Sequence, residues 1–246
     1  MIDCTDAESD PKIPTHTQGP LHWIGIDGCR GGWIVAWLKA NQPAEIHYIK
    51  ALQPFLKKAP KEAIILIDMI LYKSNEISPR PFDRFAKSQL GKWHSRVFPA
   101  PPQAALVAKD YPEACKRSLT HTGKKISKQC YHLFPKIREA NHPSIPKEQL
   151  IEYHPEIAFK QLNQNKTVEA SKKTELGRNQ RQALLEAHLP NVSIPSLSPR
   201  AKKQHWQADD LLDALALALV AQNKRYQDFY QSIAEAEAVD VNVDEG

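Results

Sequence analysis

Three aspartates lie inside or at the end of the most apolar segments of this 246-residue chain. Asp27 ends the apolar run of residues 23–26, Asp68 stands between "IILI" and "MIL", and Asp213 lies within "LLDALALAL". An unpaired carboxylate costs several kcal/mol to bury, or its pKa rises until it binds a proton. One such residue needs only a basic partner, whereas three at the ends of core segments indicate a shared cation.

Each aspartate also has a simpler structural interpretation. Asp27 precedes a glycine, and Asp-Gly is a common turn pair. Asp68 could form an ion pair with Arg80 or with another basic residue. Asp209 or Asp210 could cap the helix expected over residues 207–221, because a carboxylate is stabilised at the positive end of the helix dipole.

This last helix gives the strongest argument for a shared cation. Asp210 and Asp213 are three residues apart and therefore share one face, which continues through small and apolar residues that allow close packing on a sheet. We expect Asp209 to be the capping or helix-dipole residue, and Asp210 and Asp213 to point at the same site as Asp27 and Asp68. A few hard carboxylate oxygens are the ligands that Mg²⁺ or Mn²⁺ prefers.

Apolar segments separated by turn residues predict an α/β fold. Residues 21–40 hold two apolar runs around the turn "GCRGG", which is typical of a hairpin. Residues 44–52 alternate as a third strand, and residues 63–71 read as a strand buried on both faces. Three adjacent strands followed by a crossover to a buried strand favour a mixed sheet flanked by helices.

Changes in composition set the expected domain boundaries. Residues 1–20 are acidic and rich in Pro and Thr, which predicts a flexible tail, and the five acids of residues 234–246 predict an acidic disordered tail. Residues 21–233 form one domain, in which prolines divide residues 75–148 into short helices, a helical insertion. After it we expect a strand and helix over 150–162, a basic helix over 172–189, a loop over 190–200 and the last helix.

Residues 21–233 hold 32 basic and 19 acidic side chains. This excess suits a polyanionic partner such as nucleic acid, although a solvated basic surface would give the same count. The four cysteines form no Cys-x-x-Cys pair, which predicts reduced thiols in a cytoplasmic protein. No run approaches the roughly 18 consecutive apolar residues of a membrane span, so no membrane association is expected. The oligomeric state stays open.

Several motifs in order resemble a family of predicted nucleases of uncharacterised function, with a ribonuclease H-like fold of the RuvC type. They are GIDGCRGGW (25–33), LID (66–68), RPFDRFAKSQLG (80–91), VFPAPP (97–102), ISKQCYHLFPKIREA (126–140), EYHPEIAF (152–159), KKTELGRNQR (172–181) and ADDLLDALALA (208–218). The chain departs from the family pattern at residues 69–73, where it lacks a Pro and a Gly, and at Phe82 and Lys87.

The resemblance implies an α/β ribonuclease H-like mixed sheet in which Asp27, Asp68, Asp210 and Asp213 are the metal ligands and the catalytic acids. Two ions about 4 Å apart would activate a water and stabilise the leaving oxygen in phosphodiester cleavage.

The resemblance also marks Glu152, His154 and Glu156 as motif positions with a possible catalytic role. Either glutamate could be an extra ligand, and His154 could carry a proton. Alternatively, His154 and Pro155 end a strand and Glu156 caps the helix that follows.

Four basic residues are the expected substrate contacts, namely Arg30, Arg80, Lys173 and Arg181. Lys173 and Arg181 are eight residues apart and could hold phosphates from one helix face, or belong to a solvated face.

The leading hypothesis is therefore a cytoplasmic nuclease that uses Mg²⁺ or Mn²⁺ to hydrolyse phosphodiester bonds of DNA or RNA. One alternative is a non-cleaving nucleic-acid-binding protein with the same fold. A second is an ATP-binding enzyme of the actin/hexokinase type, but the chain is short for two such domains and lacks a second Gly-rich phosphate loop.

Overall fold

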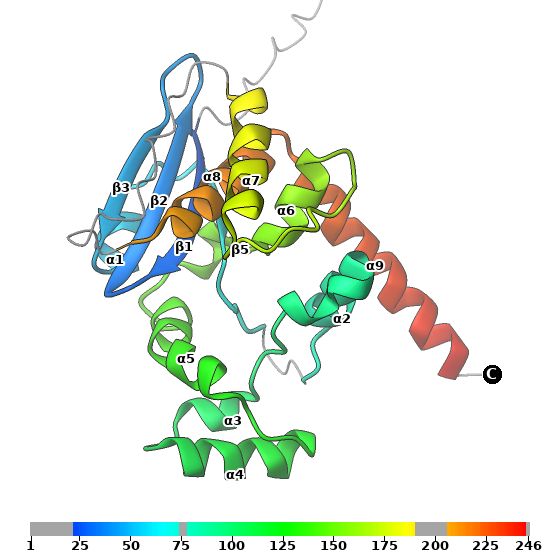
Figure 1. Cartoon of the computed structure of the whole chain (residues 1–246). Coiled ribbons are helices and arrows are strands. Elements are labelled where there is room, and N and C mark those ends of the chain that lie inside the picture. Colours follow the sequence, from blue (N-terminus) through cyan, green and yellow to red (C-terminus); the bar gives the residue numbers. More distant parts are fainter. Residues whose placement is uncertain (1–21, 74–77, 190–205, 245–246) are drawn as a thin grey trace, which may run out of the picture.

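The computed structural model describes residues 22–73, 78–189 and 206–244, with side chains up to residue 238 (Figure 1). Five strands form one mixed sheet in the order β3-β2-β1-β4-β5. They are β1 (His22–Cys29), β2 (Gly32–Lys39), β3 (Glu45–Ile49), β4 (Ile64–Ile67) and β5 (Leu150–Glu152). β1, β2 and β3 pair antiparallel, whereas β4 is parallel to both β1 and β5. The predicted hairpin, third strand and buried strand, and the mixed α/β sheet, are confirmed.

Helices cover both faces of this sheet. On one face lie α6 (Pro155–Leu162), α7 (Glu175–His188) and α8 (Ala208–Gln222), and on the other α1 (Leu52–Leu56) and α5 (Lys128–Ala140) (Figure 1). The remaining helical elements are α2 (Pro81–Leu90), η1 (Gly91–Arg96), α3 (Gln103–Leu106), α4 (Tyr111–Thr122), η2 (Lys147–Gln149) and α9 (Arg225–Asp244). The stretch predicted as a helical insertion thus holds helices between β4 and β5. Of the described helices, none has the length and apolar character needed to cross a membrane.

The acidic C-terminal segment, predicted to be disordered from residue 234, is helical through Asp244. α9 is anchored by its first half, where Phe229 and Ile233 are buried and the Phe229 ring lies 5.5 Å from that of Phe82. The Ala-Glu repeat that follows has high helix propensity, so the helix continues into the acidic residues. Residues 1–20 and 190–200, predicted to be a tail and a loop, lie outside the described residues.

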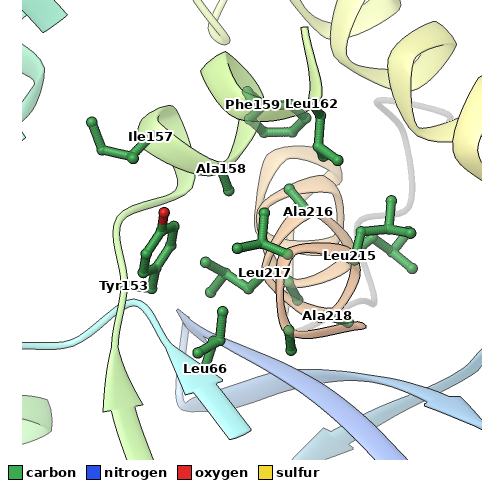
Figure 2. Close-up of a cluster of buried hydrophobic side chains, with 14 of the residues drawn as sticks. Leu66, Tyr153, Ile157, Ala158, Phe159, Leu162, Leu215, Ala216, Leu217 and Ala218 are labelled. Carbon is green, nitrogen blue, oxygen red and sulfur yellow. The ribbon is translucent and has the colours of Figure 1, made fainter. Parts of the chain in front are cut away.

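α8 packs closely against the sheet because residue 25 has no side chain. A Cβ atom at Gly25 would lie 1.9 Å from the carbonyl oxygen of Ala214 and 2.5 Å from the amide nitrogen of Ala218. Every residue of α8 from Leu211 to Ala221 is buried, between the sheet and α6 (Figure 2). This close approach fixes the start of α8 relative to the end of β1.

Candidate metal centre

Asp27 and Asp68 leave two neighbouring parallel strands at the same edge of the sheet. The β1–β4 register ends at Ile26 and Ile67, and the amide of Asp68 donates to the carbonyl of Ile26 at 2.9 Å. Side chains alternate along a strand, so Asp27 projects to the same face as Gly25, which is the face that α8 covers. Crevices at the carboxyl ends of strands are the usual ligand sites of open α/β sheets.

The start of α8 brings Asp210 and Asp213 to this edge. Asp213 precedes Ala214, which contacts β1 at Gly25, and its side chain is 1% exposed. Asp210 lies one turn earlier on the helix. The four aspartates that the sequence predicts to converge therefore come from two strand ends and one helix N-terminus around a common region.

The prediction that Asp209 caps α8 is wrong, although Asp209 does lie in the first turn of this helix. The N-cap of α8 is Gln207, and the carboxylate that accepts its backbone N–H, at 2.7 Å from Oδ2, belongs to Asp210. A residue at the third helical position can reach back to the N-cap amide, which the second position cannot do as well. One oxygen of Asp210 thus has a structural role.

The carboxylates lie close enough for their charges to affect one another's pKa. Burial first, and then the charges of Asp68 and Asp213, raise the pKa of Asp27 well above its ordinary value. Burial likewise raises the pKa of Asp213, against the opposing effect of Lys172. Burial raises the pKa of Asp210 to about 6. The fold therefore gathers carboxyl groups in a place where burial disfavours their charged form.

A residue absent from the predicted site supplies the counter-charge. The ammonium group of Lys172 lies 2.5 Å from Oδ2 of Asp213. Burial opposes its charged form, but attraction to Asp213 and Asp27 outweighs this effect and raises the pKa of Lys172. In the sequence, Lys172 and Lys173 stand side by side in the same motif, and only the path of the loop decides which one turns inward.

The donor set fits a divalent cation, although the side chains are not arranged as a ready ligand shell. Over residues 22–73, 78–189 and 206–238, no three His, Cys, Asp or Glu side chains are grouped closely enough to hold a metal ion. However, Oδ1 of Asp213 is buried and finds no hydrogen-bond partner in the described part of the chain. A buried carboxylate oxygen without a donor is costly, and a hard cation is the ligand that would satisfy it.

Three of the four aspartates line a pocket of about 430 Å³. Asp27, Asp68 and Asp210 contribute to its wall together with Lys172, and exposed side chains, including Lys173, line it as well. Its volume lies within the range of small-molecule sites, about 300–1,000 Å³. Arg30, a predicted substrate contact, is exposed in the turn between β1 and β2, three residues beyond Asp27.

Arg80 and Glu152, predicted to contact substrate and metal, line the same pocket and pair with each other in a buried network. Arg80 is 1% exposed and donates to Glu152 at 2.6 and 2.8 Å and to Asp83 at 2.7 Å. Glu152 pairs with Ile67 in the sheet, so its side chain leaves the face opposite to that of Asp68. The suggested pairing of Asp68 with Arg80 is therefore not formed.

Glu156 and Arg181 form a second buried network, with Arg96. Arg181 donates to Oε1 of Glu156 at 2.7 Å, and Arg96 donates to Oε2 at 2.8 Å. Arg181, at 1% exposed, presents no group to a phosphate, and Lys173 precedes α7 rather than sharing a face with Arg181. The N-cap of α6 is His154, whose Nδ1 accepts the amide of Glu156 at 3.1 Å, so the alternative in which Glu156 caps this helix is wrong.

These features define an α/β protein with a pocket lined by acids at the carboxyl edge of its parallel strands. The chain belongs to a family described as a protein of unknown function (DUF429), which matches residues 25–237. No curated protein and no solved structure matches the chain. The resemblance to an uncharacterised family is thereby confirmed, whereas the nuclease activity and the ribonuclease H-like fold stay predictions.

Proposed function

We propose that this protein is a nuclease with a ribonuclease H-like core, which uses Mg²⁺ or Mn²⁺ to hydrolyse phosphodiester bonds of a nucleic acid in the cytosol. The observation that carries the proposal is the unsatisfied Oδ1 of Asp213, buried beside Asp27 and Asp68 at the carboxyl edge of parallel strands. A buried carboxylate oxygen without a donor is a costly feature of a fold, which a cation would relieve.

The residues of this chain have separable roles in the proposed reaction. Asp27, Asp68 and Asp213 would hold the metal, and Asp210, with one oxygen on the Gln207 amide, would fix the start of α8. When bound, a divalent ion stabilises the negative charge that develops on the phosphate oxygens. Lys173, exposed at the pocket, is placed to attract the phosphate, as is Arg30 from the hairpin turn.

The charge of the helical segment α3–α5 supports a polyanionic substrate. Residues 103–140 hold eight basic and three acidic side chains, a net +5 that equals the formal net charge of the whole chain. Lys128, His132 and Lys136 recur every fourth residue of α5 and so share one face about 12 Å long.

The inner end of this basic face lies next to Gly28, which follows Asp27 and lines the acid pocket. The Lys136 ammonium donates to the carbonyl of Gly32, lies 4.4 Å from the centroid of the Trp33 ring, and interacts electrostatically with Asp27. Lys128, at the outer end, is exposed. A strand bound along α5 would thus lead to the carboxylates.

The proposal is tested with labelled single-stranded, duplex, hybrid and branched substrates in the presence of Mn²⁺ or of EDTA. We expect metal-dependent cleavage of at least one substrate by the native chain, and a loss of at least about 100-fold in Asp213→Asn. Circular dichroism checks that the variant is folded. Equal cleavage by the variant and the native chain would refute the assignment of Asp213.

The ion pair between Lys172 and Asp213 favours a second candidate, a non-cleaving nucleic-acid-binding protein. In that case the lysine is the permanent counter-ion of the acids. Such a protein would bind the same substrates with steep salt dependence and would cleave none of them with any divalent metal.

A further inference from the structure

We propose that Lys172 is the resident cation of the carboxylate pocket, and that a divalent metal ion binds only by displacing its ammonium group from Asp213. This inference rests on the metal site proposed above. It adds the residue that sets the metal affinity of that site, and it explains why the acids are not arranged as a ready ligand shell.

The contact between Lys172 and Asp213 carries the inference. Nζ lies 2.5 Å from Oδ2, on a side chain of Asp213 that is 1% exposed. Among the residues that the structure describes, no other basic group forms an ion pair with any of the four aspartates. The same ammonium also interacts electrostatically with Asp27 and Asp68. One lysine thus serves the cluster as a metal ion would.

The backbone that carries Lys172 is held in place from two sides. The carbonyl groups of residues 168–170 accept hydrogen bonds of 2.6–2.9 Å from Arg96 and Arg181, the two arginines that bind Glu156. On the other side, a Cβ at Gly177 would lie 2.1 Å from the carbonyl oxygen of Ser171. The loop is therefore fixed, and any displacement belongs to the Lys172 side chain.

The side chain has a route out of the pocket. It is 36% exposed although its ammonium contacts a buried carboxylate, so its stem lies toward the opening. A flexible four-carbon stem can carry the ammonium to water while the backbone stays still.

Displacement has two consequences for the site. The Oδ2 atom of Asp213, engaged by the ammonium, becomes a ligand beside the unsatisfied Oδ1. The released ammonium joins Lys173 at the pocket, where an incoming phosphate would meet both positive charges. Metal and phosphate would therefore favour each other's binding through Lys172.

The test compares Mn²⁺ binding by calorimetry in the native chain, Lys172→Met and Lys173→Met. Lys173→Met is the matched control, because it removes the same charge from the same loop, and Lys173 forms no ion pair with a carboxylate that the structure describes. We expect Lys172→Met to bind Mn²⁺ about tenfold tighter or more than the native chain, and Lys173→Met to stay within about threefold.

The other possible results separate the proposed metal site from the proposed role of Lys172. Equal or weaker Mn²⁺ binding by Lys172→Met would overturn the role of Lys172 and leave the metal site standing. Absence of binding to all three proteins would overturn the metal site itself. Binding to Lys172→Met alone would support the inference most strongly.

A second measurement uses the native chain and so does not depend on the folding of a variant. Reductive methylation followed by mass spectrometry reports how accessible each lysine amine is. Without metal, Lys172 is expected to react more slowly than Lys173, and addition of Mn²⁺ should speed its modification severalfold while Lys173 changes little. A Lys172 rate that Mn²⁺ leaves unchanged or slows would contradict displacement.

Discussion

Replacing Arg181 with methionine should destabilise the fold rather than remove a substrate contact. Arg181 is 1% exposed and donates to Glu156 and to the carbonyls of Ala170 and Gly177. Methionine has a similar length and no charge, so the variant leaves Glu156, itself 7% exposed, with Arg96 as its only basic partner among the described residues.

The size of the effect follows from the burial of this network. Breaking a buried ion pair from one side costs about 3–5 kcal/mol, because the remaining charge stays in the interior. The bond from Arg96 to Glu156, at 2.8 Å, still neutralises the carboxylate. The lower end therefore applies, about 3 kcal/mol, which for a chain of this size lowers the Tm by about 6–12 °C.

Differential scanning calorimetry and urea titration of the native chain and the variant measure this loss. The control is Arg178→Met, on the same helix, whose guanidinium makes one exposed hydrogen bond within the described residues, to the carbonyl of Lys173. It should cost less than about 1 kcal/mol. A Tm of Arg181→Met within about 2 °C of the native value, together with weaker binding of nucleic acid, would show that Arg181 reaches the substrate.

Three further changes test other parts of the structure. Burial and Asp68 raise the pKa of Asp27, so its ionisation opposes folding as the pH rises through that pKa. Asp27→Asn should therefore raise the Tm of the metal-free protein more at pH 8 than at pH 5. An equal rise in Tm at the two pH values would contradict the raised pKa. Gly25→Ala places a methyl group 1.9 Å from a carbonyl oxygen of α8, so it should lower the free energy of unfolding in urea by about 3 kcal/mol. A loss below about 1 kcal/mol would mean that α8 packs less closely on β1. Lys128→Ala should reduce the slope of the logarithm of oligonucleotide affinity against the logarithm of salt concentration by about one, whereas Lys58→Ala, at another exposed lysine, should not. Equal slopes for the two variants would mean that the substrate does not bind along α5.

The sheet and the gathering of the acids follow from local patterns in the sequence. Alternation and turn residues define the hairpin of β1 and β2, and the apolar run at residues 64–67 predicts β4. Asp27 and Asp68 each follow such a run, so parallel strands bring them to one edge without any further information. Helical spacing gives the shared face of Asp210 and Asp213 in the same way.

The partners of the charged residues could not be predicted, because they depend on contacts between distant segments. Arg80 meets Glu152 across 72 residues, and Lys172 meets Asp213 across 41. A motif position such as Glu156 is equally compatible with a metal, a helix cap or an arginine, and only the packing of α6 on α7 decides among them. The prediction of disorder from the acidic composition was wrong for α9, because the contact that anchors this helix to the domain is made by Phe229, outside the acidic stretch.

The most direct test of the central claim is anomalous diffraction from crystals of the protein grown or soaked with Mn²⁺. We expect an anomalous peak at the acid cluster, about 2.1 Å from carboxylate oxygens of Asp27 and Asp213, with the ammonium of Lys172 moved away from Asp213. A crystal that shows the Lys172–Asp213 pair intact and no peak in the pocket, at a Mn²⁺ concentration that supports cleavage, would contradict this claim.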